Sequence, residues 1–335
     1  MTIRNSKFKI QNSKFLISRR QFVRDGIGAA AMFALPIPFS ACAEQDPEVA
    51  DSAGDTVASP VPQSADEARF HEWVDIIVAA GYAQPDVSVG RTATEFGELA
   101  ADARTPYKAY TLEEYLKAGG DPSRAEPLTL SLQYFDCVTL VESCLALARV
   151  ARTDEPPTWE AFAREMERMR YRDGVREGYT SRLHYFSEWL DDNARRGLVR
   201  QLGEELGGMQ DTRPLRFMST HADAYPALAH PEILQAIIEM EKSLDDEVRW
   251  VVPTERIAEV SDSIQTGDIL AFATSIEGLD VTHAAYAYRD DAGVLRVLHA
   301  PLSGGVVEIT DSTLPEYVAA INGSTGILVA RPLQG

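Results

Sequence analysis

The chain has 335 residues, of which 45% are hydrophobic and 8% aromatic, and it carries a formal net charge of −19. This composition is that of a folded protein long enough for one large or two ordinary domains. The acidic balance argues against nucleic acid as a partner, because contacts to phosphates need clustered Lys and Arg.

Residues 1–43 do not belong to the predicted fold. Arg19 and Arg20, within Ser-Arg-Arg-Gln-Phe-Val-Arg, resemble a twin-arginine export signal, and a weakly apolar run of 14 residues, too short to span a bilayer, follows at 26–39. Two endings remain open: cleavage at Ala41-Cys42-Ala43, or lipidation of Cys42 in an imperfect lipobox, which we favour because cysteine is rare in the chain. Both predict export to the periplasm or cell envelope, and lipidation would add a membrane anchor.

Residues 44–65 are rich in Asp, Glu, Ser, Ala and Pro without periodicity, which predicts a disordered tether. From residue 66 onward we expect a single catalytic domain, 66–335. Apolar residues at helical spacing predict helices from residue 66, at about 94–104 and at 111–118, where Gly119-Gly120 ends the third helix.

The next stretch, 130–150, contains Cys137 and Cys144. Val138, Val141, Leu145 and Ala148 recur at helical spacing, and Asp136 is a good N-cap, so Cys137 falls in the first turn of the helix. The positive end of the helix dipole there favours a thiolate. The alternative is a small apolar residue at a helix end. Cys144 lies about 10 Å further along the helix, too far for a disulfide, and is predicted to be buried.

Residues 152–262 form a predicted helical insertion, with helices at 158–170 and 231–244. Within it, 179–193 combines aromatic, basic and amide side chains, which suits a groove for a polar, partly apolar ligand. This interpretation assigns substrate binding to four residues, namely Arg182, His184, Tyr185 and Trp189. The alternative is a helix whose aromatic side chains pack inward.

Beyond residue 260 the apolar period changes from that of a helix to that of a strand. Runs at 267–273, 281–288, 294–300 and 305–309 predict consecutive short strands, followed by a helix at 313–321 and a closing strand at 326–331. Helices first and strands afterwards indicate an α+β fold with a C-terminal antiparallel sheet or half-barrel.

His283 and His299 lie on adjacent predicted strands that are joined by one hairpin. Such strands allow both rings to lie on the same face, where one could serve as base for a cysteine at a helix N-terminus and the other could orient it. Two buried histidines bonded to backbone carbonyls are one alternative. A zinc site is another, but no third ligand stands at an evident spacing, so we predict no metal.

These motifs resemble the NlpC-type papain-like cell-wall peptidases. The resemblance rests on Asp136-Cys137-Val-Thr-Leu-Val-Glu142, Gln265-Thr-Gly-Asp-Ile-Leu270, Val281-Thr-His283 and Val297-Leu-His299-Ala300, in that order. Arg182-Leu-His-Tyr-Phe-Ser-Glu-Trp189 and Phe217-Met-Ser219 resemble a branch with a large helical insertion, described as N-acetylmuramoyl-L-alanine amidase-like. The likeness extends over residues 70–332. The chain departs from small members because His283 lies 146 positions after Cys137, and because a histidine occupies the third position, as in some relatives.

The resemblance implies a papain-like fold and a cysteine hydrolase that cuts an amide bond in peptidoglycan or muropeptides, most simply as an N-acetylmuramoyl-L-alanine amidase. Cys137 would be the nucleophile, His283 the base and acid, and His299 the orienting residue. Tyr134 and Asp136 would support the oxyanion site, and no cofactor is needed. Two other interpretations stay open: a stem-peptide endopeptidase, and an inactive wall-binding lipoprotein. The oligomeric state is open too.

Overall fold

The computed structural model describes residues 64–302 and 305–334. The expectations for the export signal at Arg19 and Arg20, for lipidation of Cys42 and for nearly all of the tether lie outside these residues. None of the described helices is both long enough and apolar enough to cross a membrane. The described chain forms the mixed α+β fold with an antiparallel sheet that the sequence predicts.

The N-terminal helices are α2 (Ala65–Ala79), α3 (Val89–Asp102) and the short α4 (Glu114–Lys117). Helix α3 begins five residues earlier than predicted, because the Ser88 side chain caps it by accepting a hydrogen bond from the Arg91 N–H. The first turn of α3 lies against the turn before β4, where a Cβ on Gly267 would stand 2.0 Å from the carbonyl carbon of Gly90. Glycine at both positions permits this close approach, although glycine is a poor helix former.

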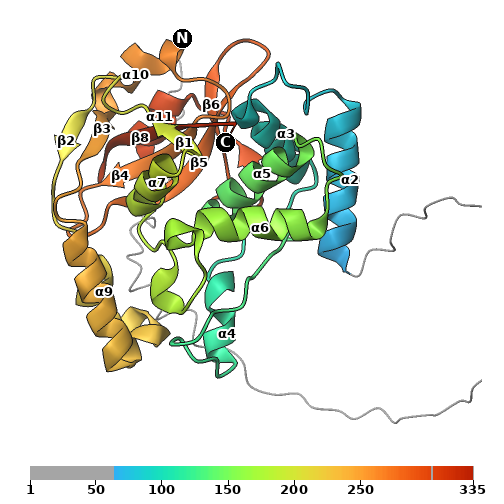
Figure 1. Cartoon of the computed structure of the whole chain (residues 1–335). Helices are drawn as coiled ribbons and strands as arrows, with labels where there is room; N and C mark the ends of the chain where they lie inside the picture. The colour runs from blue at the N-terminus through green and yellow to red at the C-terminus, as the bar shows by residue number, and fades with distance from the viewer. Residues whose placement is uncertain (1–63, 303–304, 335) are drawn as a thin grey trace, which may run out of the picture. The chain divides into compact units, whose positions relative to one another are not determined.

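Helix α5 (Cys137–Ala151) is the centre of the helical layer, and every residue from Thr139 to Ala151 is buried. Helices α2, α3 and α6 (Trp159–Arg170) gather around it on one side of the sheet (Figure 1). Arg170 of α6 is buried and donates a hydrogen bond from its Nε to Oε2 of the equally buried Glu142, at 2.8 Å. This ion pair links α5 to α6 inside the apolar core.

The sheet is antiparallel, with strand order β2-β3-β8-β4-β5-β6-β7, and β1 also pairs with β8. Its C-terminal strands follow the predicted runs closely, and α11 (Leu314–Ala320) connects the last two of them. Their bounds are β4 (Ile269–Thr274), β5 (Val281–Arg289), β6 (Leu295–His299), β7 (Glu308–Ile309) and β8 (Ser324–Pro332).

Side chains alternate between two separate apolar clusters on the two faces of this sheet. One face carries Tyr286, whose hydroxyl donates to the Val141 carbonyl of α5 at 2.7 Å. The opposite face carries Phe272 and Val297, in a cluster with residues of α11. Helices α5 and α11 therefore pack on opposite faces.

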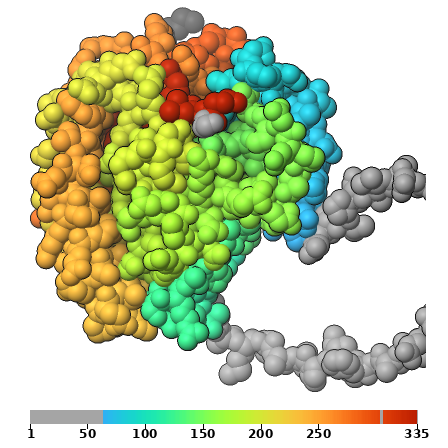
Figure 2. Space-filling model, in the orientation of Figure 1, coloured from blue at the N-terminus to red at the C-terminus, as the bar shows by residue number. Residues whose placement is uncertain are grey.

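The insertion contains more than helices. Its helices are α7 (Phe186–Arg195), α8 (Phe217–Thr220), α9 (Pro231–Ser243) and α10 (Ile257–Val260), and it adds the short strands β1 (Val199–Gln201), β2 (Met209–Asp211) and β3 (Arg249–Pro253). The predicted helices at 158–170 and 231–244 are present, but the insertion also contains strands that were not predicted. Strands β1 and β3 form through pairing with the distant β8 and have little local signal. The C-terminal end of the chain reaches the surface between the insertion and the N-terminal helices (Figure 2), where the Leu333 N–H donates to the Leu198 carbonyl.

Candidate active site

Cys137 is the first residue of α5 and is partly exposed. Asp136 caps the helix: its Oδ1 accepts the Thr139 N–H at 2.8 Å, and the Thr139 hydroxyl oxygen accepts the Asp136 N–H at 2.9 Å. This capping box satisfies donors that a helix start otherwise leaves without partners and fixes the backbone on both sides of Cys137. The prediction that Asp136 begins this helix is confirmed.

A short ladder holds the start of α5 at the outer edge of the sheet. The Val307 N–H donates to the Thr105 carbonyl at 2.8 Å, and the Phe135 N–H donates to the Pro106 carbonyl at 3.1 Å. Residues 105–107 thus join the strand edge next to β7 to the residue two positions before Cys137. Helix α5 packs on one face of the sheet, but the residues just before its first turn lie at the sheet edge next to β7.

His283 of β5 and His299 of β6 lie on the α11 face and contact each other directly. The His283 Nε2 and His299 Nδ1 atoms are 2.8 Å apart, and the side chains are 4% and 2% exposed. The His283 ring also stacks on Phe272, with ring centroids 5.6 Å apart. Both rings are therefore fixed, and the expectation that they share a face is confirmed.

Each ring has a second nitrogen that takes no part in this contact. His283 Nδ1 and His299 Nε2 are buried and make no hydrogen bond within the part of the chain that the structure describes. Burial and the neighbouring His299 hold the pKa of His283 well below its usual range, and burial lowers the pKa of His299 to about 4. Both imidazoles are therefore neutral near pH 7.

Two further residues complete the cluster, and the sequence patterns indicated neither. The Tyr317 hydroxyl of α11 lies 3.3 Å from His299 Nδ1, and Glu308 Oε1 of β7 lies 3.5 Å from His299 Nε2. Burial raises the pKa of Tyr317, and the charges of Glu308 and Cys137 raise it further. Cys137 is thus near enough to Tyr317 to affect its pKa, and Tyr317 in turn lies beside His299.

Comparison with known proteins places the chain in a family. The sequence pattern of the AmiA-like family, described as N-acetylmuramoyl-L-alanine amidase-like, matches residues 102–327. The chain belongs to this amidase-like family. The match includes Cys137, both histidines, Glu308 and Tyr317. No curated protein gives a significant match.

Solved structures related to this amidase-like chain agree in fold. An N-acetylmuramoyl-L-alanine amidase from Bacteroides uniformis is 31% identical, with a TM-score of 0.66 over 73% of this chain and 99% of that chain. A Bacteroides fragilis protein that carries the provisional name of a xylanase is 33% identical, with a TM-score of 0.60 over 70% of this chain and 99% of that chain. A Legionella pneumophila protein at 17% identity shares the fold alone, with a TM-score of 0.57 over 80% of this chain and 94% of that chain.

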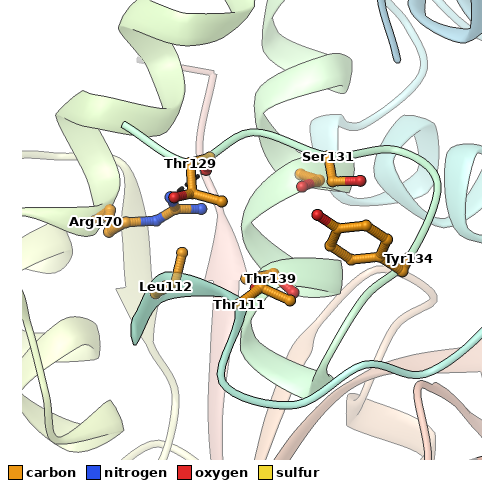
Figure 3. Close-up of a pocket in the computed structure, with 8 residues that line it drawn as sticks. Thr111, Leu112, Thr129, Ser131, Tyr134, Thr139 and Arg170 are labelled. Carbon is orange, nitrogen blue, oxygen red and sulfur yellow. Dashed lines mark hydrogen bonds between the residues drawn. The ribbon is translucent and has the colours of Figure 1, made fainter. Parts of the chain in front are cut away.

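The amidase-like chain has a small polar pocket beside the first turns of α5 (Figure 3). Hydroxyl groups dominate its lining, and the Arg170 guanidinium reaches in from α6 while donating to the Thr129 carbonyl at 2.7 Å. Tyr134 also lines it, and its ring lies 4.3 Å from the Lys108 ammonium. The lining residues are Thr111, Leu112, Thr129, Ser131, Tyr134, Thr139, Ser143 and Arg170. Tyr134 thus shares this pocket with Thr139 and Ser143 of α5, and its supporting role stays a prediction.

The residues assigned to a substrate groove lie in the interior instead. Arg182 is 8% exposed and pairs with Glu113 at 2.6 Å. The buried Tyr185 donates to Glu241 at 2.7 Å.

The other two residues of that segment are also engaged within the fold. Trp189 is buried and stacks on Phe186 with ring centroids 5.1 Å apart, while half-buried His184 bonds through Nε2 to the Tyr179 carbonyl at 2.8 Å. These contacts favour the inward-packing alternative over a groove. A run of aromatics at helical spacing is more often core than ligand contact.

The alternative of a zinc site finds no support in the geometry. The two histidines direct Nε2 and Nδ1 at each other rather than at a common centre. No group of three or more His, Cys, Asp or Glu in residues 64–302 and 305–334 could hold a metal ion.

Proposed function

We propose that this protein is a cysteine hydrolase that cuts the amide bond between the lactyl group of N-acetylmuramic acid and L-alanine in peptidoglycan or its muropeptides. The observation that carries this proposal is the His283–His299 bond. It uses Nε2 of His283 and leaves Nδ1 as the ring atom available to a thiol, and Cys137 is near enough to the neighbouring Tyr317 to affect its pKa. Family membership and the named activity of the Bacteroides uniformis relative point to the bond that is cut.

In the resting site His283 and His299 are both neutral imidazoles. Because the pKa of His283 lies well below its usual range, its imidazole is unprotonated before substrate binds. Cys137 then gives its proton to Nδ1 as it attacks, a general-base step that matches a buried imidazole. The helix start would stabilise the thiolate during the attack, when Cys137 loses its proton.

In the first half of the reaction the Cys137 sulfur forms a bond to the lactyl carbonyl carbon. The carbonyl oxygen becomes an oxyanion, for which the Cys137 N–H and the nearby Tyr134 hydroxyl are the proposed donors. His283 then gives its proton to the L-alanine nitrogen, and the carbon–nitrogen bond breaks. The products are the stem peptide, released with an amino terminus, and a muramoyl thioester on Cys137.

In the second half a water molecule replaces the peptide. His283 Nδ1 takes one water proton while the hydroxide adds to the thioester carbon, and the proton then goes to the Cys137 sulfur as it leaves. The carboxylic acid of the sugar is released and the thiol is restored. Each half needs His283 first as a base and then as an acid, and no redox partner takes part.

The remaining expectations belong to the same proposal. A papain-like arrangement, in which a cysteine opens a helix and two histidines lie on the sheet, is the architecture we infer. Export through the predicted signal would bring the enzyme to peptidoglycan. The proposed chemistry uses protein groups alone and needs no cofactor.

Mass spectrometry of purified muropeptides after incubation with the enzyme tests which bond is cut. The proposal predicts two products: a stem peptide that begins with L-alanine, and a peptide-free sugar that ends in the lactyl carboxylate. Cleavage between stem-peptide residues would instead establish an endopeptidase. Intact muropeptides that are nevertheless retained by the protein would indicate a binding protein.

A further inference from the structure

We propose that Glu308 is a positioning residue which fixes the tautomer of His299 and through it the tautomer of His283. This proposal rests on the proposed function, because it concerns the proton that His283 must accept. Glu308 lies beside the histidine pair on β7 and has no part in the proposed bond-breaking steps.

The sheet places Glu308 beside His299. The two residues are direct cross-strand partners on β6 and β7, so their side chains lie on the same face. Glu308 Oε1 lies 3.5 Å from His299 Nε2, and the carboxylate is 53% exposed while His299 is almost fully buried. The contact is longer than a full hydrogen bond, and a rotation of the exposed carboxylate can shorten it, as happens to catalytic contacts when substrate binds.

Which of the two rings donates the hydrogen bond between them decides whether His283 can act as a base. His283 can accept a proton at Nδ1 only if its other proton sits on Nε2. That Nε2–H must then be donated to His299 Nδ1, 2.8 Å away, which obliges His299 to carry its own proton on Nε2. In the opposite arrangement His299 donates from Nδ1, His283 is protonated on Nδ1, and the atom that should receive the thiol proton is blocked.

Glu308 favours the productive direction. A carboxylate accepts hydrogen bonds and cannot donate one, so Glu308 favours a proton on the neighbouring His299 Nε2. The Tyr317 hydroxyl, 3.3 Å from His299 Nδ1, can donate to that atom or accept from it, so it is compatible with either direction. His299 Nε2 is buried and makes no hydrogen bond among the described residues, so a shortened contact to Glu308 is what would satisfy an Nε2–H. Removing the carboxylate removes that acceptor, and the cost of an unsatisfied buried donor then favours the blocked tautomer.

Histidine 15N chemical shifts test the proposal directly, since they report which ring nitrogen carries the proton. In the wild-type protein at pH 7, His299 is expected to be protonated on Nε2 and His283 on Nε2. Glu308→Ala should shift both rings toward the Nδ1–H form. Glu308→Gln, which keeps an acceptor oxygen, should restore the wild-type shifts.

Turnover of muropeptides gives the second readout. Glu308→Ala should lower kcat about tenfold with little change in KM, while Glu308→Gln should recover most of the loss. Glu255→Ala removes an exposed carboxylate on the turn before α10 and serves as the matched control, with activity unchanged. If Glu308 had only a structural role, Glu308→Ala and Glu308→Gln would show the same histidine tautomers.

Two results would overturn the proposal: His299 protonated on Nδ1 in the wild-type protein, or 15N shifts that are the same in wild type and Glu308→Ala. The chemical shifts do not depend on the substrate. If the wild-type protein cleaves no muropeptide but the predicted tautomers and their response to Glu308→Ala are observed, the proposed function fails and the positioning role of Glu308 stands.

Discussion

His299 is a histidine that the fold keeps neutral, and this gives the protein a pH-dependent stability. In the unfolded chain its pKa is the usual 6.5, whereas burial lowers it to about 4 in the native state. Between these values the unfolded state binds more protons, so the free energy of unfolding falls as the pH decreases from 6.5 towards 4. Each pKa unit corresponds to about 1.4 kcal/mol, and the full effect approaches about 3 kcal/mol.

Denaturant unfolding of the wild type and of His299→Asn at pH 7 and pH 5 measures this effect. Going from pH 7 to pH 5, the wild type should lose about 2 kcal/mol more than the variant, because the other titrating groups are common to both. The same loss in both proteins would show that His299 is protonated as easily in the native state as in the unfolded chain.

The proposed mechanism gives the two histidines different roles, and substitutions should separate them. His283→Ala removes the base and should abolish turnover, and Cys137→Ala/His283→Ala should be little worse than either single variant, since members of one catalytic unit are non-additive. His299→Asn keeps a side chain that can accept the His283 Nε2–H, so it should retain measurable kcat where His299→Ala retains much less. Equal kcat values for the Asn and Ala variants would contradict an orienting role.

The sequence predicted some of these residues and missed others for a physical reason. Cys137, His283 and His299 carry reactive atoms of rare residue types, so the amino-acid sequence alone indicates their chemistry. Glu308 and Tyr317 are common residue types whose importance comes from strand register and from the placement of α11. The predicted strand at 305–309, next in sequence to that of His299, was the signal that could have identified Glu308.

At the scale of the secondary-structure element, the first turn of α5 is the part on which the site most depends. The Asp136 capping box fixes the backbone at Cys137, and removing an N-cap side chain costs about 1 kcal/mol. Asp136→Ala should therefore destabilise the protein by about 1 kcal/mol and also reduce kcat, because the Cys137 N–H and thiol lose their fixed position.

Thr158 caps α6 in the same way, accepting the Ala161 N–H at 3.1 Å, and provides a matched control. Thr158→Ala should cost similar stability in denaturant unfolding while leaving kcat unchanged. If both variants leave kcat unchanged, the cap supports the helix but does not hold the nucleophile.

Elements with strong local patterns were predicted well, and elements formed by distant pairing were not. Helix α5 and strands β4 to β6 show their periodicity within a few residues. Strands β1 and β3 each pair with the distant β8, and their sequences give no alternation that marks them. The segment 179–193 failed in another way: its polar side chains suggested a ligand, yet they form buried pairs such as Arg182–Glu113.

At the scale of the whole molecule, the proposed activity requires the chain to reach peptidoglycan. Arg19 and Arg20 precede a weakly apolar run, and we predict twin-arginine-dependent export. Replacing both arginines with lysine should leave precursor in the cytoplasm, as measured by fractionation and immunoblotting. Normal export of that variant would contradict the prediction, and labelled fatty acid on Cys42 would distinguish an anchored from a released enzyme.

Cys137 is the proposed nucleophile, and turnover of the folded Cys137→Ala variant is the decisive measurement of that role. The matched control is Cys144→Ala, which removes the buried second thiol of the same helix. On one purified muropeptide, Cys137→Ala should lose at least about three orders of magnitude in kcat, and Cys144→Ala should stay close to the wild type. A folded Cys137→Ala protein with kcat within about tenfold of the wild type would contradict the cysteine mechanism.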